Sequence, residues 1–406
     1  MTQPELNQDW LEDFEIIRSF HDSEVTEKVA TLLDHSGFPE QLKLLFGALS
    51  EKDRGAHSIQ DFLHSLRQAT SIKHLQALES AFLGAVLKST LSQVRTVGLK
   101  PAATEGQTEP HYLFISNHRD IVLDPLILNW VTLENGLSSC HCAIGDNLLV
   151  DESGRLIALL NKCFAVLRSI KSPKAMVAAM RTQSAYIRHL RFNALANIWI
   201  AQREGRSKDN SDRTNPALIK MLGLAKPKEM PLAEYIKALR LVPISLSYEW
   251  DPCDLQKAEE LLAIEKGTYK KDGMADLKAV RDGLTGDKGQ IQVYFDTQFS
   301  DRIPPGATHD DIAQMIDQSI QKNYAFYPVT FAAAALLSKL SGADKHISEA
   351  IAQQQQSANC GQPDIDKATI KLEQRLSGAS AEIRKRVLTS YAQPILSYIA
   401  HQSYQA

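Results

Sequence analysis

The chain has little of what would place it in a special class of protein. Its longest apolar run, residues 327–340, is shorter than the roughly 20 residues of a membrane-spanning helix, so we expect no integral membrane segment. A formal net charge of −3 in 406 residues excludes a general attraction to nucleic acid. The first ten residues have neither a basic start nor an apolar stretch, and we expect no secretory signal. These absences predict a cytoplasmic protein.

Cysteine is also scarce, and its five copies do not have the spacing of a disulfide framework. Reduced thiols are the simplest interpretation. The segment Cys140-His141-Cys142 offers three metal-binding side chains, but a structural zinc ion needs four ligands and the sequence has no second close pair. We therefore expect neither a metal ion nor another cofactor.

The apolar pattern divides the chain into three parts. It has helical spacing up to about residue 99, with almost no strand signal. Short apolar segments then alternate with helical patterns, and the helical pattern returns after residue 310, with a glutamine-rich connection at residues 353–364. We predict an α/β fold with a mixed sheet flanked by helices in a domain of residues 100–305, with helical additions at 1–99 and 306–406. The predicted strands are residues 112–115, 164–167, 196–200, 241–245 and 290–295, and the predicted helices between them include 125–133, 173–190 and 232–239.

The segment Ser-Asn-His-Arg-Asp-Ile-Val-Leu-Asp-Pro, residues 116–125, is the first candidate for chemistry. It follows the apolar residues 112–115 and leads into a helical pattern, so His118 is expected at a strand-to-helix corner. A histidine beside a carboxylate can act as a general base, because the carboxylate fixes the tautomer and stabilises the imidazolium. Asp120 and Asp124 are both candidates for that carboxylate. The alternative is that His118 only caps the helix.

A polar turn at residues 203–208, Arg-Glu-Gly-Arg-Ser-Lys, is the second candidate. Gly205 permits close backbone approach, Arg206 can grip a phosphate with two parallel hydrogen bonds, and Lys208 adds a point charge. Glu204 and other acidic residues alternate with these cations. A salt-bridged surface loop is therefore the alternative to an anion site.

Two further segments combine apolar strands with special residues. Arg168 ends the apolar residues 164–167, which places a cation at a strand end. Pro243 interrupts the apolar residues 241–245, which suggests an edge strand or an irregular pairing. The apolar wall of this strand suits an acyl chain, since burial of each methylene contributes about 0.8 kcal/mol. Ordinary core packing is the alternative.

In their order along the chain, these segments resemble the four motifs of the glycerolipid acyltransferase superfamily, whose members acylate glycerol 3-phosphate, lysophosphatidate and other lysophospholipids. The resemblance covers about residues 95–300. The residues of these segments also look like those of a bacterial branch of the superfamily. The family leaves four residues between its histidine and aspartate, whereas His118 is followed by Asp120 after one residue and by Asp124 after five. We favour Asp124, because Pro125 continues it into an apolar helix as in the family.

The resemblance implies acyl transfer without a cofactor, from acyl-CoA or acyl-carrier protein to a hydroxyl of a glycerol-phosphate or lysophospholipid acceptor. His118 would be the general base. The phosphate would be held by cations of the second and third motifs, and it stays open whether Arg206 or Lys208 meets it, because the family's residue between glycine and arginine is missing here. The substrate-binding candidates are Arg119, Arg168, Glu204, Gly205, Arg206 and Lys208.

Two other functions stay open from the sequence. The first is a non-catalytic lipid-binding scaffold with the same fold, which the irregular spacing after His118 favours; it would gain if neither aspartate reached the imidazole ring. The second is a hydrolase of esters or thioesters. Because the substrate comes from a membrane, we also expect peripheral contact with the inner face of the cell membrane. The candidate surfaces are the helical patterns at residues 324–340 and 383–399, for which packing against the rest of the protein is the alternative.

Overall fold

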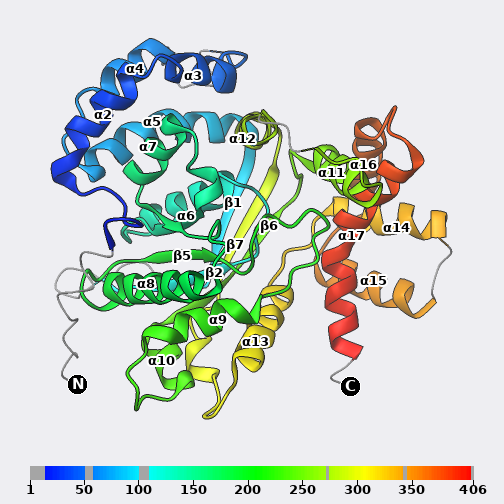
Figure 1. Cartoon of the computed structure of the whole chain (residues 1–406). Coiled ribbons are helices and arrows are strands. Elements are labelled where there is room, and N and C mark those ends of the chain that lie inside the picture. The colour runs from blue at the N-terminus through cyan, green and yellow to red at the C-terminus, as the bar shows by residue number, and fades with distance from the viewer. Residues whose placement is uncertain (1–13, 51–57, 100–108, 271–273, 342–344, 404–406) are drawn as a thin grey trace.

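A mixed β-sheet runs through the middle of the molecule (Figure 1). The computed structural model describes residues 14–50, 58–99, 109–270, 274–341 and 345–403. Seven strands lie in the order β1-β7-β6-β2-β5-β3-β4, with β6 and β7 antiparallel and all other neighbours parallel. The strands are β1 (Leu91–Val97), β2 (Leu113–Ser116), β3 (His141–Gly145), β4 (Cys163–Val166), β5 (Ile198–Ala201), β6 (Leu241–Tyr248) and β7 (Gly289–Phe295). The predicted α/β class and mixed sheet are confirmed.

Helices cover both faces of this sheet, because alternate side chains of each strand point to opposite sides. Leu113 and Ile198 face a core built with α8, α9 and α13, whereas Phe114 and Trp199 face a core built with α5 and α6. The helices before β2 are α2 (Val25–Asp34), α3 (Phe38–Phe46), α4 (Ile59–Leu66) and α5 (Ile72–Thr90). Those between β2 and β7 are α6 (Leu123–Glu134), α7 (Glu152–Leu160), α8 (Pro173–Phe192), α9 (Pro216–Leu222), α10 (Leu232–Ala238), α11 (Asp254–Glu265) and α12 (Ala275–Thr285). Those after β7 are α13 (His309–Lys322), α14 (Pro328–Ser341), α15 (Lys345–Ser357), α16 (Gln362–Arg375) and α17 (Ala381–Ser403).

Pro243 lies in an interior strand, so the prediction of an edge strand is wrong, and no register shift marks an irregular pairing at this residue. The first half of β6 pairs with β2, with Ile115 opposite Pro243. Pairing with β7 begins at the next residue, Ile244. The absent N–H of proline therefore falls where β6 has a neighbour on one side, and no ladder bond is lost.

The sequence prediction missed two strands and made one connection between helices too long. The apparently helical first part of the chain ends in β1, which has mixed burial and lies at the edge of the described sheet beside β7. β3 was not predicted because its five residues include a cysteine, a histidine and a glycine, which give no clear alternation. Of the glutamine-rich segment 353–364, which was predicted as a connection, residues 353–357 belong to α15 and 362–364 to α16, so the connection is limited to residues 358–361. Residues 100–108 of the predicted polar loop lie outside the described residues.

The C-terminal helices form a second core of their own beside the sheet (Figure 1). Val329 and Phe331 of α14 and Val387 and Leu388 of α17 are buried in it, together with Trp250. The apolar faces that were candidates for membrane contact are therefore occupied by packing. Among the described helices, we find none that combines the length and the apolarity of a membrane span.

Candidate functional site

The first motif leaves the sheet at the carboxyl end of β2, where bonds on both sides hold it. Asn117 is fully buried, and its side chain donates to the carbonyl of Leu246 (2.9 Å) and accepts from the amide of Leu246 (2.8 Å). It thereby continues the pairing of β2 with β6 past the end of the strand. On the other side, the indole N–H of Trp199 donates to the hydroxyl of Ser116 (2.9 Å). The next residue, His118, therefore starts from a fixed backbone position.

Asp124 is the carboxylate that contacts His118. Nδ1 of His118 lies 2.7 Å from Oδ2 of Asp124, and the same oxygen accepts the backbone amides of Arg119 (2.6 Å) and Asp120 (3.0 Å). Oδ1 accepts the hydroxyl of Tyr248 (2.7 Å). These four donors match the acceptor capacity of an ionised carboxylate, although Asp124 is fully buried. Burial, with a smaller effect of Asp124, raises the pKa of Tyr248 well above its usual value, so this phenol stays a donor.

The second ring nitrogen of His118 is available. Because Asp124 accepts from Nδ1, the proton sits there and Nε2 carries the lone pair. Nε2 has no hydrogen-bond partner among the described residues, and the side chain retains 15% of its exposure. The ring of Trp199 stands edge-on to the imidazole, with centroids 5.8 Å apart. With one nitrogen held and the other open, this geometry would allow His118 to accept a proton from a bound hydroxyl.

Asp120 has a different position in the site. Its Oδ1 accepts the amides of Val122 (3.0 Å) and Leu123 (2.9 Å), at the start of α6. It thus serves as the acceptor that caps this helix. Burial, and next the charge of Asp124, raise the pKa of Asp120. The turn that Asp120 closes brings Asp124 back onto the ring of His118, although five residues separate the two in the sequence.

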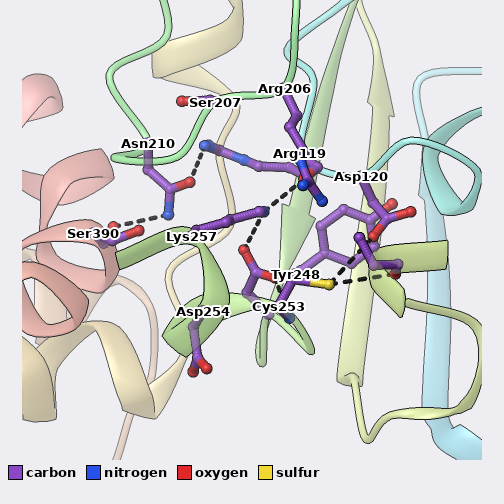
Figure 2. Close-up of polar contacts among 12 residues, drawn as sticks. Arg119, Asp120, Arg206, Ser207, Asn210, Tyr248, Cys253, Asp254, Lys257 and Ser390 are labelled. Carbon is purple, nitrogen blue, oxygen red and sulfur yellow. Dashed lines mark hydrogen bonds and ion pairs between the residues drawn. The ribbon is translucent and has the colours of Figure 1, made fainter. Parts of the chain in front are cut away.

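Arg119 lies inside the protein, with 3% of its surface exposed. Its guanidinium donates to Asn210 and forms an ion pair with Asp212 (2.6 Å), and it lies over the ring of Tyr324. Figure 2 shows the side chains of Arg119 and Asn210 directed at one another. Asn210 in turn donates to the carbonyl of Ser390 in α17 (2.8 Å). Both terminal nitrogens of this guanidinium are engaged inside the protein, while Nε is buried without a partner among the described residues.

The turn after β5 lies directly against the first motif. The backbone amide of Ser207 donates to the carbonyl of His118 (2.7 Å), so residues 89 positions apart share a hydrogen bond. Gly205 has a φ of +70°, in the left-handed region that favours glycine. The Arg206 side chain is 9% exposed and lies 3.8 Å from Glu260, and its Nη1 is buried without a partner in the described part of the chain.

Lys208 and Arg168 complete the cations that the sequence pointed to. Lys208 pairs with Glu260 of α11 (2.6 Å). Arg168 comes from the end of β4 and pairs with Glu204 in the turn after β5 (3.4 Å). All three cationic motif residues, with Glu204 and Gly205, therefore belong to loops that follow the carboxyl ends of β4 and β5, while Arg119 stays apart in the interior.

Three residues of this region were missed at the sequence level. Tyr248 donates to Asp124, Glu260 neutralises the cations, and Lys257 donates to the carbonyl of Arg119 (2.6 Å) and pairs with Asp251 (2.5 Å). Figure 2 shows Lys257 reaching from α11 toward the first motif. Tyr248 was signalled by its place at the end of an apolar strand. Glu260 and Lys257 lie on an ordinary charged helix, and no pattern distinguishes them.

The cysteines do not build a metal centre. All five are free. Within the described residues, no group of three or more histidine, cysteine, aspartate or glutamate side chains is arranged to hold a metal ion. His141, between two buried cysteines, has its Nδ1 3.4 Å from the hydroxyl of Ser19.

Comparison with known proteins gives little beyond this geometry. No family model matches the chain, and no curated protein sequence matches it significantly. Among solved structures, the chain is similar to the crystal structure of the 1-acyl-sn-glycerophosphate (LPA) acyltransferase PlsC from Thermotoga maritima. The TM-score is 0.33 at 12% sequence identity, over 72% of this chain and 93% of that chain. A likeness of this size carries no argument about function, so the chemistry of the chain must be inferred from the geometry of the site.

Proposed function

We propose that the protein transfers an acyl group from a thioester to a hydroxyl of a phosphate-bearing glycerol acceptor. The observation that carries the proposal is the pair of His118 and Asp124 (2.7 Å) at the end of β2, hydrogen-bonded through Ser207 to a cationic loop. A base and an anion site in adjoining loops suit a substrate that carries both a hydroxyl and a phosphate. The order of the four sequence motifs supports the same reaction.

In this mechanism Nε2 of His118 takes the proton of the acceptor hydroxyl as its oxygen attacks the thioester carbonyl. The tetrahedral intermediate collapses with cleavage of the carbon–sulfur bond. The imidazolium returns its proton to the departing thiolate, so no proton is gained or lost overall. Asp124 stabilises the imidazolium while it exists, and Tyr248 holds Asp124 in place. No covalent enzyme intermediate is needed, because a thiol is already a good leaving group.

The acceptor phosphate would be bound by Arg206, with Lys208 and Arg168 as further cations. Arg206 is favoured because its Nη1 is buried without a partner among the described residues, and such a donor costs free energy until a ligand accepts from it. Glu260 and Glu204 pair with these cations and fix their side chains. A fixed phosphate would place the hydroxyl within reach of His118, which lowers the entropic part of the barrier.

The geometry also bears on the two alternatives. A non-catalytic scaffold would be favoured if neither aspartate reached the imidazole, and Asp124 does reach it. A hydrolase would use the same base on water, so the difference lies in whether an acceptor is required. Product formation must therefore be measured with and without an acceptor.

The first test uses His118→Ala, with His64→Ala of α4 as the control for loss of an exposed imidazole. Purified proteins would receive acyl-CoA or acyl-carrier protein with glycerol 3-phosphate, lysophosphatidate or unphosphorylated glycerol. We expect acylated product from the native chain with a phosphorylated acceptor, and a loss of about 10²- to 10⁴-fold in His118→Ala, the range for a general base. Undiminished transfer by a folded His118→Ala, or thioester cleavage independent of acceptor, would contradict the proposal.

A further inference from the structure

One long segment of the chain has positive charges without any negative ones. From Ser153 to Arg203 there are nine lysines and arginines and no aspartate or glutamate, in a chain whose formal net charge is −3. The segment spans most of α7 and all of β4, α8 and β5. Such separation of charge gives one part of the surface a positive potential that the total charge does not reveal.

Three of the four exposed cations of this segment lie at the start of α8, and the fourth, Arg155, lies in α7. Lys174, Val177, Ala178 and Arg181 are all exposed and follow the spacing i, i+3, i+4, i+7, so they lie on one face of the helix. Lys171, just before the helix, is exposed as well. In the described part of the chain, none of these three cations forms an ion pair or a side-chain hydrogen bond. We call these five residues the α8 face.

This face borders the candidate site. α8 follows β4, whose carboxyl end supplies Arg168 (Figure 1). Two acidic residues contact the chain just before α8, and both have partners there. Glu204 pairs with the Arg168 guanidinium, and Asp146 accepts the backbone amides of Arg168 and Ser169. Within the α8 face, the exposed aliphatic side chain of Val177 lies on the same side of the helix as Lys174 and Arg181.

We propose that the α8 face docks on an anionic lipid bilayer. Lysine and arginine near such a surface each contribute about fivefold to the binding constant, and exposed aliphatic side chains between them can enter the interface. An acidic protein would attract the cations but gives no role to Val177, which is 47% exposed. The inference rests on the proposed function for its purpose, since docking here would hold the loops of Arg168 and Glu204 close to a membrane-derived acceptor. The main readout of its test, vesicle binding, does not depend on activity.

The experiment measures cosedimentation of the full chain with vesicles of phosphatidylcholine, alone or with about 30% phosphatidylglycerol. The test variant is Lys171→Gln/Lys174→Gln/Arg181→Gln. The control is Lys73→Gln/Lys278→Gln/Lys322→Gln, which removes three exposed cations from α5, α12 and α13. We expect the native chain and the control to bind the anionic vesicles, the test variant to bind about 100-fold more weakly, and added salt to weaken native binding.

Equal thermal stability of both triple variants and the native chain shows that the fold is kept. The proposal is overturned if vesicle binding by the native chain does not depend on phosphatidylglycerol, or if both triple variants bind the anionic vesicles equally. So does a test variant that keeps vesicle binding and loses activity only with acyl-carrier protein, because the α8 face would then recognise an acidic protein. His118→Ala should bind vesicles like the native chain. If the proposed reaction is not observed, the vesicle-binding result can therefore still be interpreted.

Discussion

Two buried aspartates six residues or fewer from His118 have distinct positions, which follow from the donors around each. Asp124 meets the imidazole, two backbone amides and a phenol. Asp120 meets the amides that begin α6. The sequence put both in the site and favoured Asp124 only through the family resemblance, because the turn between them decides which carboxylate faces the ring. That turn is set by hydrogen bonds that no spacing rule contains.

The roles of Asp124 and Asp120 can be distinguished by replacing each with asparagine, which exchanges one carboxylate oxygen for an NH2 group. In Asp124→Asn the amide group cannot accept from all four donors, so the imidazole loses its tautomer control, and we expect turnover to fall about 10³-fold. Asp120→Asn keeps the oxygen that caps α6, since asparagine caps as well as aspartate, and should retain most of the turnover. Steady-state kinetics of the two variants would decide; equal losses would contradict the division between them.

At the scale of elements, α11 joins the candidate site to the C-terminal helices. Lys257 reaches the carbonyl of Arg119 on one side, and Asp254 accepts from Arg375 (2.6 Å) and Tyr391 (2.8 Å) on the other. The five predicted strands and three named helices could be read from apolar periodicity. Contacts such as those of α11 could not, because a charged helix gives the same pattern whether its charges face solvent or another element.

Lys257 should therefore matter for stability as well as for position. It is 1% exposed, and Lys257→Met leaves the charge of Asp251 buried without its partner. We expect a loss of about 3–5 kcal/mol in the free energy of unfolding. Adding Asp251→Asn removes that stranded charge and should restore part of the loss. Urea unfolding of the single and double variants measures both; a double variant no more stable than the single one would show that the charge is not the cause.

For the whole molecule, the sequence predicted the class of fold but not the full set of strands in the sheet. β1 was read as helix because its pattern is irregular, and it becomes a strand only through its partner β7. Likewise, the second core of α14, α16 and α17 accounts for apolar helix faces that the sequence alone left open between membrane contact and packing. Pairings and packings between distant segments are the information that local patterns lack.

The stability of the whole molecule should also depend on pH through one histidine. Burial, and next the charge of Lys162, lower the pKa of His141 to about 3. An unfolded histidine titrates near pH 6.5. As the pH falls from about 6.5 toward 3, the unfolded state therefore gains a proton that the folded state does not, and stability declines by about 1.4 kcal/mol for each pH unit.

His141→Gln removes the contribution of this histidine to the pH dependence of stability. The carboxylates, which titrate in both proteins, are unchanged. Between about pH 6.5 and 5.5 the variant should lose about 1 kcal/mol less than the native chain. Denaturant unfolding at both pH values, compared between the two proteins, isolates the contribution of this histidine. Parallel losses would mean that His141 accepts a proton within the fold.

The pairing of β1 with β7 also has a consequence for synthesis on the ribosome. Leu91 lies opposite Gly289, 198 residues later, and among the described strands β7 alone lies beside β1. At a translation rate of about 5–20 residues per second, the two are separated by roughly 10–40 s. During that interval β1 lacks the hydrogen bonds of β7, whereas the hydrogen bonds of α5 before it are local and do not require residues made later. The N-terminal helices therefore need not wait for β7, but the edge of the sheet must.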